Sequence, residues 1–287
     1  MIRLGIGIEK TRRSGGLASI VTDLDALAYV TAANITSSTE QVALNDFVIA
    51  LKACNMWDRL YAFYPLLGST LTQTTYNLKD PATYQITWTG SPTIVSKGLQ
   101  FDGTTQHGDP NFSPIAVPGF SMANFMFGCY DATGFNSRTE IPMGITEGEF
   151  GETRARAVWF ADNSNILDIW ASNNSSSRVV FSGANGQAVG HWAFERRSTT
   201  SVKVYQFTTS SGDNYEKGQS TTAAPIATPT NKFLLAATSA GLAGVNSVAL
   251  RSNKLYKYFY LAQATLSAAQ FLQFRTALYN FNVATGK

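Results

Sequence analysis

The feature that most constrains this chain of 287 residues is a succession of short apolar–polar alternating runs that begins near residue 84. A period of two places every second side chain on the same face of a strand. The runs are separated by turn-prone stretches such as TGFNS, SNNSSS and GANGQ. Many short strands at this spacing predict a β-sandwich or jelly roll. The longest loop that we expect covers residues 210–231.

The composition favours the same class. Charged residues make up 14% of the chain, well below the average of about a quarter. Their place is taken by Ser, Thr, Asn, Gln and Gly, together with 18 Phe, 12 Tyr and 5 Trp. This mixture suits half-buried pleated surfaces and frequent turns. It is typical of an extracellular or particle-borne β protein, and the chain is long enough to bury a large core.

Two segments change to helical spacing, which divides the chain into an arm, a lead-in and a sandwich. In the predicted helical lead-in, residues 36–72, the apolar positions follow steps of three, four and three: Leu44, Phe47, Leu51 and Cys54. Ser38 and Gln41 have the spacing of a capping box. The sandwich domain is predicted to cover residues 73–287.

A second helix is predicted to close the sandwich at the end of the chain. Ser267 and Gln270 again have the spacing of a capping box. The apolar stripe of this helix consists of Phe271, Phe274, Leu278 and Phe281.

Residues 1–35 lack a firm period, and glycines loosen the first half. We expect an extended N-terminal arm, either ordered only within an assembly or disordered. The densest basic cluster, EKTRR at residues 9–13, indicates a solvated tail or an assembly contact. A net charge of +3 is too small to indicate nucleic-acid binding, which needs basic residues clustered on one face.

The sequence also bears on the compartment. The first residues lack the apolar core of a signal peptide, and no run approaches the ~20 apolar residues of a membrane span. Cys54 and Cys129 are too few for a disulfide framework and too far apart for a zinc site. We expect each to be a buried free thiol.

Four ordered motifs carry a family resemblance: YNLKDP (76–81), TWTGSPTIVSKGLQFDGTTQHGDPNFSP (87–114), RRSTTSVKVY (196–205) and FYLAQATLSAAQFLQF (259–274). Together they resemble the concanavalin A-like, laminin-G-like jelly rolls of bacteriophage virion proteins. The resemblance covers roughly residues 40–285. It implies that Phe101 is a core residue and that Asp102 and Gly103 form a turn. Where the family has a tight Asn-Gly hairpin, this chain has SSGDNYEKG, so we expect an expanded hairpin that offers a contact surface.

Because the family includes glucanases, carboxylate pairs require attention. EGEFGE places Glu147, Glu149 and Glu152 in a pattern similar to the ExDxxE of laminarinase-like enzymes. Retaining hydrolysis needs two carboxyl groups about 5–5.5 Å apart. Here flanking glycines and the lack of apolar alternation favour a solvated loop, so we predict that the chain is not an enzyme and has no catalytic residues.

The remaining candidates also favour structural roles. The chain has two histidines, His107, expected on an exposed strand, and His191, expected at a strand start beside Trp192. No nucleophile–base arrangement can be nominated from their spacing, and a lone GxG near the N-terminus does not indicate a nucleotide site. We predict no cofactor and no cofactor-binding residues.

Two ligand classes remain open from residue type alone. Some laminin-G-like domains carry calcium on rim aspartates, for which the residues of the right type are Asp102, Asp109, Asp131 and Asp162. They lack a diagnostic spacing, so we predict no metal site. Carbohydrate binding would use an exposed aromatic platform, but Trp88, Trp159, Trp170 and Trp192 all lie in strand-like runs where core packing is commoner.

The resemblance therefore implies a structural or adhesion protein of a phage virion, associated with capsid, tail or fibre. It would contact other virion proteins, form a homo-oligomer and attach to a host-surface glycan. The alternatives of the same fold are a carbohydrate-binding module and a glycan-cleaving enzyme.

Overall fold

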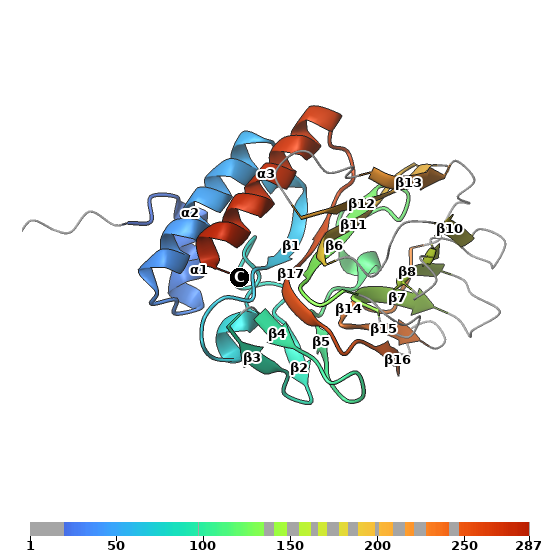
Figure 1. The fold of residues 1–287 in the computed structure, drawn as a ribbon, viewed down its shortest axis with the longest axis horizontal. Helices are drawn as coiled ribbons and strands as arrows, with labels where there is room; N and C mark the ends of the chain where they lie inside the picture. The colour runs from blue at the N-terminus through green and yellow to red at the C-terminus, as the bar shows by residue number, and fades with distance from the viewer. Residues whose placement is uncertain are drawn as a thin grey trace, which may run out of the picture.

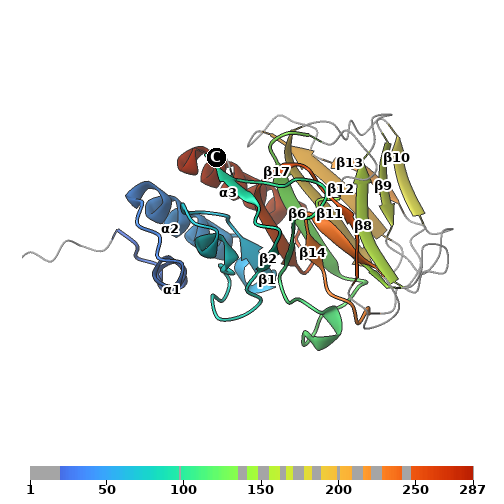
Figure 2. The ribbon, with the colours of Figure 1, turned by 90° about the horizontal axis from the view of Figure 1, so that it is seen from below.

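The computed structural model describes residues 20–96, 98–134, 141–147, 155–161, 166–170, 178–182, 189–198, 201–208, 216–220, 228–240 and 247–286. Within these ranges two β-sheets form a sandwich, and three α-helices gather on one side of it (Figures 1 and 2).

The first sheet, which we call the helix-covered sheet, has eight strands among the described residues. Its order is β13 (Glu216–Ser220), β12 (Ser201–Phe207), β11 (Gly190–Ser198), β6 (Phe125–Asp131), β17 (Leu255–Ala262), β4 (Gly98–Gln100) and β3 (Thr93–Val95), with β1 (Leu60–Tyr64) also paired to β17. Strands far apart in the sequence are therefore neighbours, because β6 lies between β11 and β17. Such crossovers are those of a jelly roll.

The second sheet, the open sheet, has nine described strands. They run in the order β10 (Arg178–Ser182), β9 (Ile166–Trp170), β8 (Ala155–Ala161), β7 (Met143–Glu147), β14 (Leu234–Leu235), β5 (His107–Asp109) and β2 (Thr87–Thr89), with β15 (Ala237–Ala240) beside β7 and β16 (Ser247–Arg251) beside β15. The mainly β sandwich, with a helical lead-in and a C-terminal helix, confirms the predicted fold class.

The central strands of the helix-covered sheet are buried on both faces. Along β6, Phe125 and Phe127 point into a core shared with the open sheet, whereas Met126 between them packs against the helices. The same alternation places Phe259 of β17 in the first core and Tyr260 in the second. A strand buried on both faces needs apolar residues at nearly every position, which explains runs such as FMFGCY.

The helical layer consists of α1 (Leu24–Ala32), α2 (Ser38–Ala53) and α3 (Ala268–Thr285), supplemented by the short 3₁₀ turns η1 (Trp57–Arg59), η2 (Thr72–Thr75) and η3 (Pro114–Ala116). The predicted capping box of α3 is present, since Ser267 and Gln270 bond each other's backbone N–H groups. The predicted apolar faces of α2 and α3 are also buried.

The predicted cap of α2 is wrong by one residue. Ser37, not Ser38, is the N-cap, and its hydroxyl accepts from the N–H of Glu40. Gln41 instead donates its side-chain N–H to the carbonyl of Ile35 at 2.7 Å. Adjacent serines make the two registers indistinguishable from spacing alone.

The predicted extended arm is also wrong over part of its length, because residues 24–32 form α1. Asp23 caps this helix by accepting from two backbone N–H groups, and its carboxylate also lies 2.7 Å from Lys52 Nζ of α2. Asn45 of α2 is buried and accepts from the backbone N–H groups of Thr22 and Asp23. These bonds attach α1 to α2. Residues 1–19, including EKTRR, lie outside the described residues.

Other expectations meet mixed outcomes. Phe101 is buried and Asp102 accepts from the N–H groups of Thr104, Thr105 and Gln106, with Gly103 at φ 74°, so the predicted core residue and turn are confirmed. Cys54 and Cys129 are free and buried, as predicted. The predicted loop over 210–231 contains β13, which pairs with β12, and the tip of that hairpin lies outside the described residues.

Candidate assembly surface

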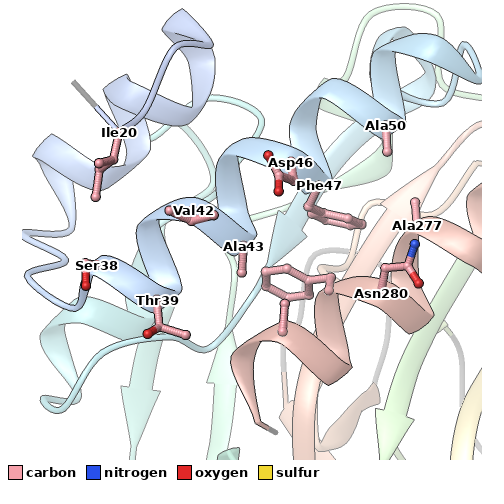
Figure 3. Close-up of a pocket in the computed structure, with 12 residues that line it drawn as sticks. Ile20, Ser38, Thr39, Val42, Ala43, Asp46, Phe47, Ala50, Ala277 and Asn280 are labelled. Carbon is pink, nitrogen blue, oxygen red and sulfur yellow. The ribbon is translucent and has the colours of Figure 1, made fainter. Parts of the chain in front are cut away.

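A groove runs between α2 and α3 on the side that faces away from the sheet (Figure 3). Residues from the start of α2 face residues from the end of α3, so the two helices are antiparallel. The hollow has a volume of about 530 Å³. It is lined by Ile20, Ser38, Thr39, Val42, Ala43, Asp46, Phe47, Ala50, Ala277, Asn280, Phe281 and Ala284.

The floor of the groove is aromatic. Phe47 of α2 and Phe281 of α3 stack with ring centroids 4.6 Å apart, and both are buried. Phe63 of β1 lies beneath them, with its ring centroid 4.9 Å from that of Phe47. The groove is therefore built on the second hydrophobic core and is as fixed in place as that core.

Small side chains keep the groove open. Ala43, Ala50 and Ala277 occupy positions where a larger residue would fill the space between the helices. A second hollow of about 400 Å³ shares Ala50, Ala277 and Asn280 with the first and continues towards Cys54 and Leu272. The two hollows form one continuous groove along the helix pair.

The rim of the groove exposes large apolar side chains. Ile20, Val42 and Leu272 are 47%, 42% and 45% exposed, and Val283, next to the lining residue Ala284, is 62% exposed. Asp46 is a charged group on this lining. A concave apolar strip with few polar groups suits an apolar segment of protein. We call it the α2/α3 groove.

Sequence reasoning did not find this groove, although a signal is present. Val42 and Ile49 lie seven residues apart and outside the predicted Leu44–Phe47–Leu51 face of α2. Apolar residues on a second face of a surface helix indicate a second contact.

The two histidines have structural positions. His191 is fully buried, with Nδ1 2.8 Å from the Tyr258 hydroxyl and Nε2 3.2 Å from the Tyr260 hydroxyl. Burial and the charge of Arg275 lower the pKa of His191 well below its usual value. His107 was expected to be exposed but is buried in β5, and burial together with Arg251 lowers its pKa. Pairing of β5 with both β2 and β14 encloses it.

The carboxylates considered for catalysis fall largely outside the described residues. The predicted solvated loop is wrong at Glu147, which ends β7, a strand whose Met143 and Ile145 side chains are buried in the sandwich core. The side chain of Glu147 and the whole of Glu149 and Glu152 lie outside the described residues. A different carboxylate, Glu195 of β11, is buried and accepts from the Tyr205 hydroxyl at 2.6 Å. Burial raises its pKa, against the opposing effect of Arg197, whose Nε lies 2.8 Å from Glu195 Oε2.

The aspartates considered for calcium bind parts of their own chain. Asp109 pairs with Lys232 at 2.9 Å. Asp131 is buried and accepts from the N–H groups of Thr133 and Gly134, while burial raises its pKa. Asp162 lies outside the described residues. Within the ranges that the structure describes, His, Cys, Asp and Glu side chains form no group of three or more that could hold a metal ion.

The tryptophan side chains that the structure describes do not form an exposed aromatic platform. Trp192 is fully buried, and Trp88 is half-buried with its indole N–H donated to the Thr74 hydroxyl at 3.1 Å. Trp159 and Trp170 lie in β8 and β9, and their side chains are outside the described set. No helix in the described part of the chain has the length and apolar character needed to cross a membrane.

Comparison with known proteins finds similarity to solved structures alone. No protein-family model and no curated protein matches it. Among solved structures, the chain is similar to the CBM40 of Ruminococcus gnavus IT-sialidase, with 12% identity, coverage of 62% of this chain and 95% of that one, and a TM-score of 0.41.

Two further structures are similar. Domain 4 of AbnA, a GH43 extracellular arabinanase from Geobacillus stearothermophilus, was solved in complex with arabinotriose and shares 16% identity over 75% of this chain and 98% of that one, with a TM-score of 0.44. A Trypanosoma rangeli sialidase mutant displaying trans-sialidase activity shares 12% identity with this chain. The match covers 85% of this chain and 39% of that one, with a TM-score of 0.47. At these values the likeness concerns the sandwich and carries no argument on function.

Proposed function

We propose that this chain is a non-enzymatic structural protein of a bacteriophage particle, associated with its capsid, tail or fibre. Its copies assemble through the α2/α3 groove, and the sandwich and lead-in are displayed for attachment to host-surface glycans. The observation that carries the proposal is the continuous apolar groove on the helix pair, which no described part of the chain fills. The motif resemblance to phage jelly rolls supplies the virion context.

The proposed occupant of the groove is the N-terminal segment of a neighbouring copy. In that segment Ile2, Leu4, Ile6 and Ile8 alternate with small or polar residues, so one apolar side can enter the groove. The described chain begins at Ile20, which itself lines the groove. Exchange of an identical element between copies is a low-cost route to a closed oligomer.

Charge supports the same occupant. Residues 1–19 hold four basic side chains and one acidic one, a net +3. The whole chain, with 22 basic and 19 acidic residues, also carries +3, so everything after residue 19 is neutral in sum. A basic segment next to Asp46 on the groove lining is favourable.

A pair of matched variants tests the proposal. Val42 and Val189 are 42% and 40% exposed, but only Val42 lines the groove. Val42→Arg places a charge in the path of the apolar segment and is expected to reduce the light-scattering mass to that of a monomer. Val189→Arg is expected to leave the oligomer intact. Equal masses for both variants and the unsubstituted chain would contradict assembly through this groove.

A carbohydrate-binding module acting without a particle is the second candidate. It is favoured by a separate polar groove in the lead-in, which shares no lining residue with the α2/α3 groove.

A further inference from the structure

A second, polar groove lies where the end of α1, the start of α2 and the segment 68–76 meet. One part has a volume of about 370 Å³ and is lined by Ala32, Ala33, Asn34, Thr36, Ser69, Thr70, Thr72, Gln73 and Tyr76. An adjoining part of about 230 Å³ shares Thr36, Ser69 and Gln73 and adds Ser37, Glu40 and Gly68. We call the two parts together the polar groove.

Gln73 holds the walls of the polar groove together. Its Oε1 accepts from the backbone N–H groups of Ser69 and Thr70 at 2.8 and 2.9 Å, and its Nε2 donates to the carbonyl of Asn34 at 2.7 Å. Gly68 makes this possible, because its φ is +90° and a Cβ there would lie 2.6 Å from Gln73 Oε1. The groove is therefore formed before any ligand arrives.

Four polar groups on the lining have hydrogen-bonding capacity to offer a ligand. The side-chain amide of Asn34 and the hydroxyls of Thr36, Thr72 and Tyr76 make no hydrogen bond with the described residues. Asn34, Thr36 and Thr72 are exposed, whereas the Tyr76 ring is half-buried and packs against the core of the helical layer. Tyr76 thus offers a fixed aromatic edge, and the amide and hydroxyl groups beside it can both donate and accept hydrogen bonds.

The charge of the lining selects among ligands. Among the described residues, no Lys, Arg or His lines either part, and Glu40 is the charged residue on the lining. An anionic ligand such as a sialic acid, a uronic acid or a phosphate would meet a carboxylate and no cation. A neutral ligand rich in hydroxyl groups matches both the hydrogen-bonding capacity and the charge.

From this lining we infer that the polar groove binds a neutral oligosaccharide, through the Asn34 amide, the Thr36 and Thr72 hydroxyls and the Tyr76 ring. The inference rests on the proposed attachment function and assigns it a site in the lead-in rather than on the sandwich. It makes no use of the α2/α3 groove.

The first step of the test probes the complete chain on an array of neutral and anionic oligosaccharides, followed by titration calorimetry with the best neutral trisaccharide and with 3′-sialyllactose. We expect binding of neutral glycans and at least tenfold weaker binding of sialyllactose. No binding of any glycan would overturn both the inference and the attachment function.

The second step locates the site with matched variants. Asn34 and Asn55 both adopt a left-handed backbone after a helix, at φ 51° and 58°, and both are exposed. Asn34→Gly removes the groove amide with no backbone strain, and Asn55→Gly is the equivalent change after α2. We expect Asn34→Gly combined with Thr72→Val to weaken binding at least tenfold, and Asn55→Gly to leave it unchanged. Undiminished binding by the groove variant would overturn this site while leaving the attachment function standing.

Discussion

Phe47 of α2 and Phe281 of α3 stack at a centroid distance of 4.6 Å and form the floor of the α2/α3 groove. This contact joins the lead-in to the end of the chain. It also continues inward, because the Phe281 ring meets Phe63 of β1 edge-on at 6.4 Å. The groove and the covered face of the sheet therefore depend on the same aromatic cluster.

Phe281→Ala is expected to destabilise the protein by about 3–5 kcal/mol, the range for truncating a buried Phe. The cost arises from lost burial and from the cavity left beside Phe47. Val283→Ala, two residues along and 62% exposed, is the control and should change the free energy of unfolding by less than about 0.5 kcal/mol. Urea unfolding curves measure both, and equal small changes would show that Phe281 is not part of the core.

Stability is expected to fall as the pH drops below about 6.5. Burial, with Arg275, keeps the folded-state pKa of His191 well below that value, so the unfolded chain binds a proton that the folded chain does not. The contribution is fully present above the unfolded pKa of about 6.5 and is lost progressively as the pH falls towards the folded pKa, by up to about 1.4 kcal/mol per pH unit.

The comparison with His191→Phe isolates this effect. The variant retains a ring that can stack on Phe207, whose centroid lies 4.3 Å from that of His191, but it cannot titrate. It should be less stable at pH 7, because the Tyr258 and Tyr260 hydroxyls lose their partner, and its stability should fall less steeply between pH 6.5 and 5. Parallel curves for the two proteins would contradict the assignment to His191.

Asp102→Ala is expected to cost about 1 kcal/mol by removing the acceptor of an exposed turn, by analogy with the loss of a helix cap. Although slight burial opposes it, donation from the Thr105 hydroxyl and from three backbone N–H groups holds the pKa of Asp102 well below its usual range. Asp102→Asn keeps an acceptor oxygen and should lose less. Thermal unfolding of the unsubstituted chain and the two variants measures the order of their stabilities. An Asp102→Ala variant as stable as the unsubstituted chain would show that the turn does not need this acceptor.

Much of the fold could be predicted because its determinants are periodic. Phe125, Phe127 and Phe194 lie at strand spacing and meet in the sandwich core. The apolar stripe from Phe271 to Phe281 forms the buried face of α3, as its helical spacing predicts. The turn at Asp102-Gly103 follows from the local chemistry of those two residues.

The predictions that were wrong also have identifiable physical causes. The helix α1 is only nine residues long, and much of its support comes from Asn45 and Lys52 of another helix. His107 is buried by pairing with strands that its own sequence context does not reveal. Val42 and Ile49 mark a second apolar face of α2, but the shape of a groove depends on which faces several packed segments leave open, so both grooves were missed.

We expect no glycan turnover by this protein. Glycines on both sides of Glu149 in EGEFGE favour a loop for that carboxylate, and a hydrolase would need two carboxyl groups at close range. Release of reducing ends from neutral polysaccharides, followed over hours, should stay at the level of the buffer. Turnover by the unsubstituted chain that disappears on combining Glu147→Gln with Glu149→Gln would contradict the non-enzymatic assignment.

The most direct test of the account is the mass in solution of the complete chain and of a variant that lacks residues 1–19. Light scattering should find a closed oligomer for the complete chain and a monomer for the truncated one, because the apolar segment Ile2 to Ile8 is lost while every described element remains. A monomer in both forms would show that the segment does not join copies, and an oligomer of equal size in both would show that assembly uses another surface.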